Sequence, residues 1–349
     1  MKVQHHKDLE TLNGRLQSFP TFAKYFFDYK LAKELSPSTL LEYSKNFFSF
    51  FNWIAINFPE YAINHSLDIN ISHLEMINVE HIQQFESHLR LVDQLSARTT
   101  TRRLQAVRSL FNYLHDIAED TEGYPLLKRN VFRKIPTTRV TDALTNAREI
   151  QDKTLNSKEA DDFIDYIRNQ YQSDNSSNVQ AVWNYNKNGI RDICIINLML
   201  RAGLLVSDIV NLNIHDISLN DNSIKIHRQW SGRASYHCIY FGEKTAIEIN
   251  SYLKIRTDSY QVNESEEALF LALKNGQSIG KRMTKRAIQS MVIKYSNKYG
   301  ENKITTRQLR HSFGINHHRQ NSAVDTKTQL ALRNLEATEK YQILTILLD

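Results

Sequence analysis

The chain has 349 residues, of which 41% are hydrophobic and 23% charged, values typical of a folded protein rather than a disordered or fibrous one. This length exceeds what one simple core usually supports and predicts two domains. Lysine and arginine outnumber aspartate and glutamate by 44 to 38, and the net charge of +6 favours a polyanionic partner. A charge of this size is also common in proteins without such a partner.

Cysteine and histidine spacing indicates no metal centre. Cys194 and Cys238 belong to no CxxC or histidine-spaced cluster, and His317 and His318 have no carboxylate at ligand spacing. We therefore expect no metal, no cofactor and no disulfide framework. The first ten residues lack the apolar segment of a signal peptide, and no apolar run approaches the length of a membrane span. We expect a cytoplasmic protein without membrane association.

The first 135 residues are predicted to form a helical domain. Ser36 followed by Pro37 is typical of a helix start, with serine as N-cap and proline in the first turn. The segment that follows carries apolar side chains at helical spacing, namely Leu40, Tyr43, Phe47, Phe50 and Phe51. This pattern predicts a helix with one buried face.

A second segment, at 96–116, combines an apolar face with a basic one. Leu104, Val107, Phe111 and Leu114 recur at helical spacing. Three arginines crowd its first half largely off that face, beside serines and threonines suited to phosphate contacts: Arg98, Arg102 and Arg103. Such a stripe is either a solvated surface or a DNA-facing one, and both interpretations stay open.

The composition changes after residue 136. All five prolines precede that point, and the polar segment 136–154 is predicted to be a linker. Residues 155–349 are predicted to be mainly helical, with one β-hairpin around a Ser231-Gly232 turn, because apolar residues alternate on both sides of it. The expected fold class is mainly α with a small β-sheet (α+β).

Three stretches of the second part resemble the signature boxes of tyrosine recombinases, the phage integrase family. They are "LMLRAGLLVSDIVNLNIHDISL" (198–219), "TTRQLRHSF" (305–313) and "LALRNLEATEKY" (330–341). Their order and separation match the family, as does the hairpin between the first two. The segments "LSPSTLLEYSKNFFSFFNWI" and "LSARTTTRRLQAVRSLFNYL" resemble its N-terminal core-binding domain. The chain looks closest to the single-protein Xer recombinases of Gram-positive bacteria, the XerS type.

The resemblance implies a helical, SAM-like core-binding domain at 1–135 and a catalytic-type domain at 155–349, with duplex DNA as partner. The family site consists of a tyrosine nucleophile, two arginines on the scissile phosphate, a lysine on the hairpin and two histidines. By resemblance, Tyr341 is the nucleophile and Arg310 the second arginine. The other four positions are replaced, and they fall on Leu205, Gly232, Arg307 and Leu332.

These replacements have a chemical consequence. Removing one donor to a developing phosphate charge costs a factor of about 10² to 10³ in rate. Loss of proton transfer costs a further factor of about 10² to 10⁴. Leu205 and Leu332 donate nothing, and Arg307 replaces a proton-transfer residue by a permanent cation. We therefore predict a DNA-binding protein of DNA recombination or integration with impaired or lost strand transfer.

Two other functions remain open at this point. Arg307, Arg310 and Arg233 could form a phosphate pocket, while Arg201, one turn before Leu205, either replaces the lost guanidinium or is solvated. With such substitutes the chain would be an active site-specific recombinase that forms a 3′-phosphotyrosyl intermediate. A helical interaction protein that does not bind DNA is the third hypothesis, which the basic segment and the retained arginine oppose.

Assembly is a further expectation. The resemblance implies a synaptic oligomer of the protein with itself or with an active recombinase. In the family, the segment after the tyrosine commonly docks on a neighbouring subunit, and here it is apolar, with Ile343, Leu344, Ile346, Leu347 and Leu348. For the free protein we expect this segment to pack in cis against its own domain.

Overall fold

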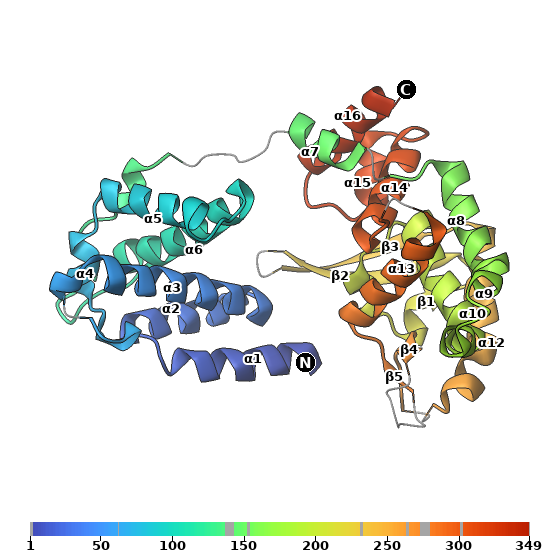
Figure 1. The fold of residues 1–349 in the computed structure, drawn as a ribbon, viewed down its shortest axis with the longest axis horizontal. Helices are drawn as coiled ribbons and strands as arrows, with labels where there is room; N and C mark the ends of the chain where they lie inside the picture. Colours follow the sequence, from blue (N-terminus) through green and yellow to red (C-terminus); the bar gives the residue numbers. More distant parts are fainter. Residues whose placement is uncertain are drawn as a thin grey trace. The chain divides into compact units, whose positions relative to one another are not determined.

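The computed structural model describes residues 3–61, 63–136, 143–151, 154–230, 233–262, 265–272, 280–300 and 303–348. Contacts divide the chain into two units, Met1–Val140 and Thr141–Asp349, and each has its own hydrophobic core. Most described residues lie in helices, and the sheets are small and antiparallel (Figure 1). The predicted fold class, mainly α with a small β-sheet, is confirmed.

In its described residues, the regular elements of the first unit are all helices, with no strands. Its helices are α1 (Val3–Leu16), α2 (Thr21–Ala32), α3 (Pro37–Asn57), α4 (Ile71–Met76), α5 (Val79–Leu91) and α6 (Ala97–Asp116), with short 3-10 turns at Pro59–Tyr61, Ser66–Asp68 and Val131–Lys134. Helix α3 begins as predicted, because the Ser36 side chain accepts the Thr39 N–H. Its predicted apolar face is buried except for the partly exposed Tyr43.

The second unit is also mainly helical. Its helices are α7 (Ala143–Gln151), α8 (Ser157–Asn169), α9 (Tyr171–Asp174), α10 (Val179–Arg201), α11 (Val206–Asn211), α12 (Glu243–Tyr260), α13 (Lys285–Tyr299), α14 (Thr306–His318), α15 (Ala323–Gln329) and α16 (Glu339–Leu348), with 3-10 turns at Ile214–Asp216 and Leu335–Thr338. Helix α10 is the central element, buried from Arg191 to Leu200, and it packs against α8, α12 and α14. None of the described helices is long and apolar enough to cross a membrane.

The sheets comprise a three-stranded and a two-stranded one. Strands β1 (Ile217–Ser218), β2 (Ser223–Trp230) and β3 (Arg233–Tyr240) form the first, and β4 (Leu271–Ala272) and β5 (Lys281–Arg282) the second. Strands β2 and β3 form the predicted hairpin, in which Ile226 pairs with His237 and Arg228 with Ser235. The turn residues Ser231 and Gly232 lie outside the described residues.

The segment 136–154 is not the simple linker expected from its polar composition. Its described part contains α7, which packs against α16, and Figure 1 shows the two helices side by side. Ala147 of α7 is fully buried in a small cluster with Tyr341 and Leu344. A few apolar residues spaced along α7, such as Ala147, are therefore enough for this helix to pack against α16. The C-terminal segment packs in cis, as expected for the free protein.

Candidate functional site

Arg310 is held at the centre of the second unit. Thr305 caps helix α14, because its side chain accepts the Gln308 N–H, and Arg310 lies one turn further on, only 6% exposed. Its guanidinium donates to the carbonyl of Gly203 and to that of Leu330, the latter at 2.7 Å. Burial lowers the pKa of Arg310 to about 10, so this arginine stays charged at neutral pH.

The turn at Gly203 places position 205 two residues after a carbonyl that Arg310 binds. Gly203 has a φ of +69°, and a Cβ there would lie 2.4 Å from the ring of Phe313, so the turn requires glycine. Leu205 follows as the N-cap residue of α11, with its N–H donated to Asp208 Oδ2 at 2.8 Å. Its side chain is 37% exposed. Position 205 therefore shares Asp208 with the surroundings of Arg310, but its side chain offers no donor.

Tyr341 is enclosed between α14 and α16. The side chain is 1% exposed, and a Cβ at Gly314 would come within 2.5 Å of its ring, so close approach of the two helices depends on that glycine. The Tyr341 hydroxyl lies 3.2 Å from His311 Nδ1. Burial raises the pKa of Tyr341, against the opposing effect of the nearby Arg310 and Arg307. The hydroxyl is therefore protonated in the free protein.

The imidazole of His311 connects Arg307 to Tyr341. Arg307 Nε donates to His311 Nε2 at 3.2 Å, so Nε2 carries no proton and the hydrogen of the neutral ring lies on Nδ1. We assign the tautomer from this network, and it makes His311 the donor to the Tyr341 hydroxyl. Burial, together with Lys340, Arg307 and Arg310, lowers the pKa of His311 to about 3. The ring is neutral at physiological pH.

Lys340 is a member of the site that the sequence analysis missed. Its Nζ lies 4.9 Å from the centroid of the Tyr341 ring. Burial, then Arg307 and Arg310, lower the pKa of Lys340 to about 8. Its position directly before the tyrosine was a visible signal, but nothing in the sequence indicated that this lysine is partly buried.

Arg228 and Asp208 were also missed. Arg228 Nη2 lies 2.7 Å from Asp208 Oδ2, and Nη1 donates to the carbonyl of Ala331 at 3.0 Å. Both side chains are largely buried. The alternation of the hairpin could have indicated that Arg228 points inward, because it follows Ile224 and Ile226 on the inward face of β2.

Other predicted residues lie elsewhere. Arg201 pairs with Asp161 of α8 and donates to Asn197 Oδ1 at 2.9 Å, so its contacts are not with Arg310. Leu332 is half-buried against the apolar cluster around Tyr341. Arg233 begins β3, but its side chain, like the whole of Gly232, lies outside the described residues.

The predicted basic stripe on α6 is divided. Arg102 is exposed and Arg98 half-buried. Arg103 makes its contacts inside the first unit, where its Nη1 lies 3.2 Å from Asp93 Oδ2 and 3.0 Å from Ser49 Oγ. Of the three arginines, Arg102 is therefore the best placed to contact a partner.

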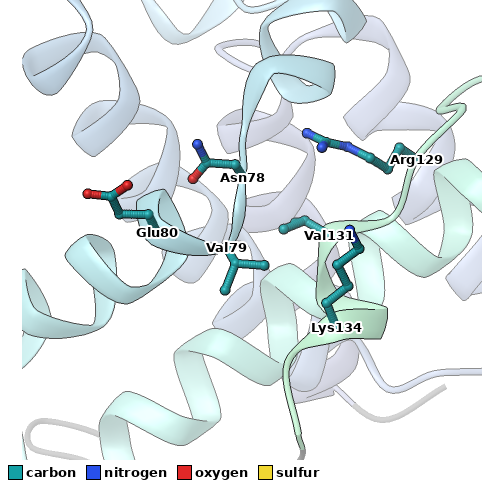
Figure 2. Close-up of a pocket in the computed structure, with 6 residues that line it drawn as sticks. All are labelled: Asn78, Val79, Glu80, Arg129, Val131 and Lys134. Carbon is teal, nitrogen blue, oxygen red and sulfur yellow. The ribbon is translucent and has the colours of Figure 1, made fainter.

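A hollow of about 260 Å³ lies at the start of α5 in the same unit. Figure 2 shows Arg129 and Lys134 on one side of it, with the carboxylate of Glu80 on the other and turned away. Arg129 donates to the carbonyls of Glu75 and Ile77, both at 3.0 Å. This hollow is thus cationic on one side, but its arginine also holds the local backbone together.

Neither histidine of the "INHH" segment points to a metal centre. His317 Nδ1 and His318 Nδ1 lie 3.1 Å and 3.4 Å from the hydroxyl of Thr326. Within the described part of the chain, no group of three or more histidine, cysteine, aspartate or glutamate side chains could hold a metal ion.

Known families and relatives match most of the chain. Residues 153–345 match the phage integrase family, and residues 22–116 match the phage integrase N-terminal SAM-like domain. The chain is 30% identical over 344 residues to tyrosine recombinase XerS of Streptococcus pneumoniae (strain Hungary19A-6) and to that of Streptococcus sanguinis (strain SK36). In both comparisons 95% of this chain and 94% of the relative are covered.

Solved structures show the same fold. XerH site-specific recombinase bound to difH substrate aligns with a TM-score of 0.65 at 16% identity, covering 96% of this chain and 86% of that one. A lambda integrase dimer bound to a COC′ core site aligns with a TM-score of 0.58 at 10% identity, covering 92% and 94%. The family match and the 30% identical relatives confirm the resemblance inferred from the three sequence boxes.

Proposed function

Because this chain belongs to the phage integrase family, whose members act in DNA recombination, we propose that it binds duplex DNA with impaired or lost strand transfer. The phosphates of the bound duplex would contact the cations around Arg310 and the exposed Arg102 on α6. A role on DNA would place the protein in the cytoplasm, as the sequence analysis expects. Its partners would be duplex DNA and either further copies of itself or an active recombinase.

The observation that carries this proposal is the hydrogen bond between His311 and Tyr341. A neutral imidazole that donates to the phenol cannot also take its proton through the same nitrogen. Leu205 stands where the family has its first guanidinium, and Leu332 stands where the family has a proton donor, so neither group is available. Cations thus surround a buried nucleophile position, an arrangement that supports phosphate binding more than cleavage.

One observation favours a second candidate function, an active recombinase that forms a 3′-phosphotyrosyl intermediate through Tyr341. Lys340 lies against the ring of that tyrosine, and burial lowers its pKa to about 8. An ammonium group with this pKa is close to the ideal for proton transfer at neutral pH. In an active enzyme, Lys340 would supply the proton that the leaving 5′ oxygen needs.

The deciding experiment is incubation with a nicked suicide substrate. The DNA site is first obtained by selection from a random duplex library with the purified protein. The suicide substrate then traps any phosphotyrosyl bond as a covalent protein–DNA adduct. We expect tight duplex binding and no adduct. An adduct that forms at an appreciable rate and disappears in Tyr341→Phe would establish the active enzyme instead.

A further inference from the structure

Two guanidinium groups meet at one turn of the second unit. Arg310 of α14 donates to the carbonyl of Leu330 at 2.7 Å, and Arg228 of β2 donates to the next carbonyl, that of Ala331, at 3.0 Å. The charge of Arg228 is among the causes that lower the pKa of Arg310. The two cations are therefore neighbours, although they come from elements far apart in the chain.

Arg228 also lies beside the backbone of position 205. The same carboxylate oxygen, Asp208 Oδ2, accepts the Leu205 N–H at 2.8 Å and Arg228 Nη2 at 2.7 Å. Asp208 thus links the guanidinium of Arg228 to the backbone N–H of position 205, where the family has an arginine. Arg228 occupies the neighbourhood from which the family guanidinium is missing.

The charges and donors of this site are not balanced. The described residues linked by these contacts and charge effects include one carboxylate, that of Asp208, which pairs with Arg228 and acts on Arg310. They include four cations, because Arg310 also acts on Lys340, as does Arg307. In addition, Arg228 Nε is buried and has no hydrogen-bond partner among the described residues. A buried N–H without an acceptor is costly, and an oxyanion would provide both the acceptor and the countercharge.

We propose that Arg228 is a phosphate-binding residue that, with Arg310, forms a two-arginine clamp on one DNA phosphate in place of the arginine lost at position 205. The inference rests on the proposed DNA-binding function. A guanidinium fork matches the geometry of a phosphate and presents two parallel donors to it. Asp208 fixes the orientation of this fork, so the clamp is already arranged before DNA arrives.

The test moves the arginine from position 228 back to position 205. Arg228→Gln, which can still donate to Asp208, is compared with the double variant Leu205→Arg/Arg228→Gln on a library-selected duplex. We expect Arg228→Gln to weaken binding about 10- to 100-fold, as for the loss of a charge-assisted phosphate contact. The double variant should recover most of that loss, because the second guanidinium returns to the same neighbourhood.

Replacing single DNA phosphates by neutral methylphosphonates distinguishes a DNA contact of Arg228 from a purely structural role of this residue. Methylphosphonates are placed one at a time along the duplex, and one of them should weaken binding by the wild type. In Arg228→Gln that same methylphosphonate should have little further effect, because its partner is already gone. Arg228→Lys keeps a charge but loses the fork, so its DNA affinity should lie between those of the wild type and Arg228→Gln. This variant replaces Arg228→Gln in the test if Arg228→Gln does not fold.

Arg256 of α12 provides the matched control. Its largely buried guanidinium also donates to backbone carbonyls, those of Ala268 and Leu269. Arg256→Gln should lose stability but keep the wild-type methylphosphonate pattern. If the wild type binds duplex DNA and Arg228→Gln shows unchanged affinity and pattern, the clamp is disproved while DNA binding stands. If the wild type binds no duplex at all, the proposed function fails and the clamp with it.

Discussion

His311 Nδ1 lies 3.2 Å from the hydroxyl oxygen of Tyr341, and both side chains are buried. The contact joins α14 to α16 across 30 residues of sequence. It holds Tyr341 in place by a hydrogen bond in which the neutral imidazole is the donor. The same bond therefore stabilises the free protein and leaves the phenol without a proton acceptor on that ring.

This pair should show measurable coupling in stability. His311→Leu leaves the buried Tyr341 hydroxyl without its partner, which should cost about 1–3 kcal/mol of unfolding free energy. In the His311→Leu background, Tyr341→Phe should then cost less than it does in the wild type. A double-mutant cycle in urea should give a coupling of about 1 kcal/mol. Strictly additive effects would show that the two groups do not interact in solution.

Local signals explain why much of the fold was predictable. Ser36 and Pro37 mark the start of α3 because capping depends on neighbouring residues only. The hairpin was visible because alternation on a half-buried sheet is also a local property. Helix α7 was not visible: what docks it is burial of Ala147 against α16, nearly 200 residues away along the chain.

Only those residues of the candidate site that lie at recognised positions of the family's signature boxes were predictable from the sequence. Arg310 and Tyr341 were predicted from their motifs, and the structure places Arg310 on α14 and Tyr341 on the adjacent α16, while their catalytic roles stay predictions. Lys340 and Arg228 belong to no such motif, and their roles depend on burial and on partners distant in sequence. Arg201 shows the converse, because helical spacing from Leu205 did not reveal its ion pair with Asp161.

Lys340 should give the stability of the protein a characteristic pH dependence. Its pKa is lowered from 10.5 to about 8 in the folded state, so folding disfavours its charged form. Between these values the unfolded chain binds one proton more than the folded chain, and stability must rise with pH. The gain should reach up to about 3 kcal/mol.

Lys340→Met provides the measurement. The variant should be more stable than the wild type at pH 7, where the lysine is charged and partly buried. The difference between the two proteins should shrink from pH 8 upwards, as the wild-type lysine loses its proton. Urea unfolding of both proteins at pH 7 and pH 10 checks this. A difference that stays constant with pH would mean that Lys340 titrates normally.

The cis packing of α16 can be tested with two residues of that helix. Leu344 is fully buried and Ile346 is 71% exposed. Leu344→Ala should lower the unfolding free energy by about 2–4 kcal/mol through the cavity it leaves, whereas Ile346→Ala should change it by less than about 0.5 kcal/mol. If the segment instead docks on a second copy, the loss in Leu344→Ala should depend on protein concentration, which unfolding at two concentrations would reveal.

The division of the basic stripe on α6 predicts different effects for adjacent arginines. Arg102 is exposed, so Arg102→Gln should weaken binding to all duplexes and reduce the slope of log K against log salt by about 0.9. Arg103 pairs with Asp93, and Arg103→Gln should mainly change stability, by up to about 1 kcal/mol. Salt titrations of both variants decide the matter, and an unchanged slope in Arg102→Gln would place the DNA on another face.

The last prediction concerns the chemistry itself. If the site is eroded, Tyr341→Phe should leave DNA affinity nearly unchanged, because its hydroxyl has no reaction to perform. Arg310→Ala should weaken DNA binding by about 1.5–3 kcal/mol, the value of a charge-assisted contact. It should also destabilise the fold, since Arg310 holds the carbonyls of Gly203 and Leu330. Affinity is therefore measured well below the unfolding temperature of the variant.

Restoring the family residues tests the geometry of the site. The restored variant combines Leu205→Arg, Gly232→Lys, Arg307→His and Leu332→His. It also removes the hydrogen bond from Arg307 to His311, which frees the imidazole to take the Tyr341 proton. On the suicide substrate we expect an adduct from this variant only, and none when Tyr341→Phe is added. Should the natural chain already form the adduct and Lys340→Met abolish it, the lysine is the proton donor and the protein is an active recombinase.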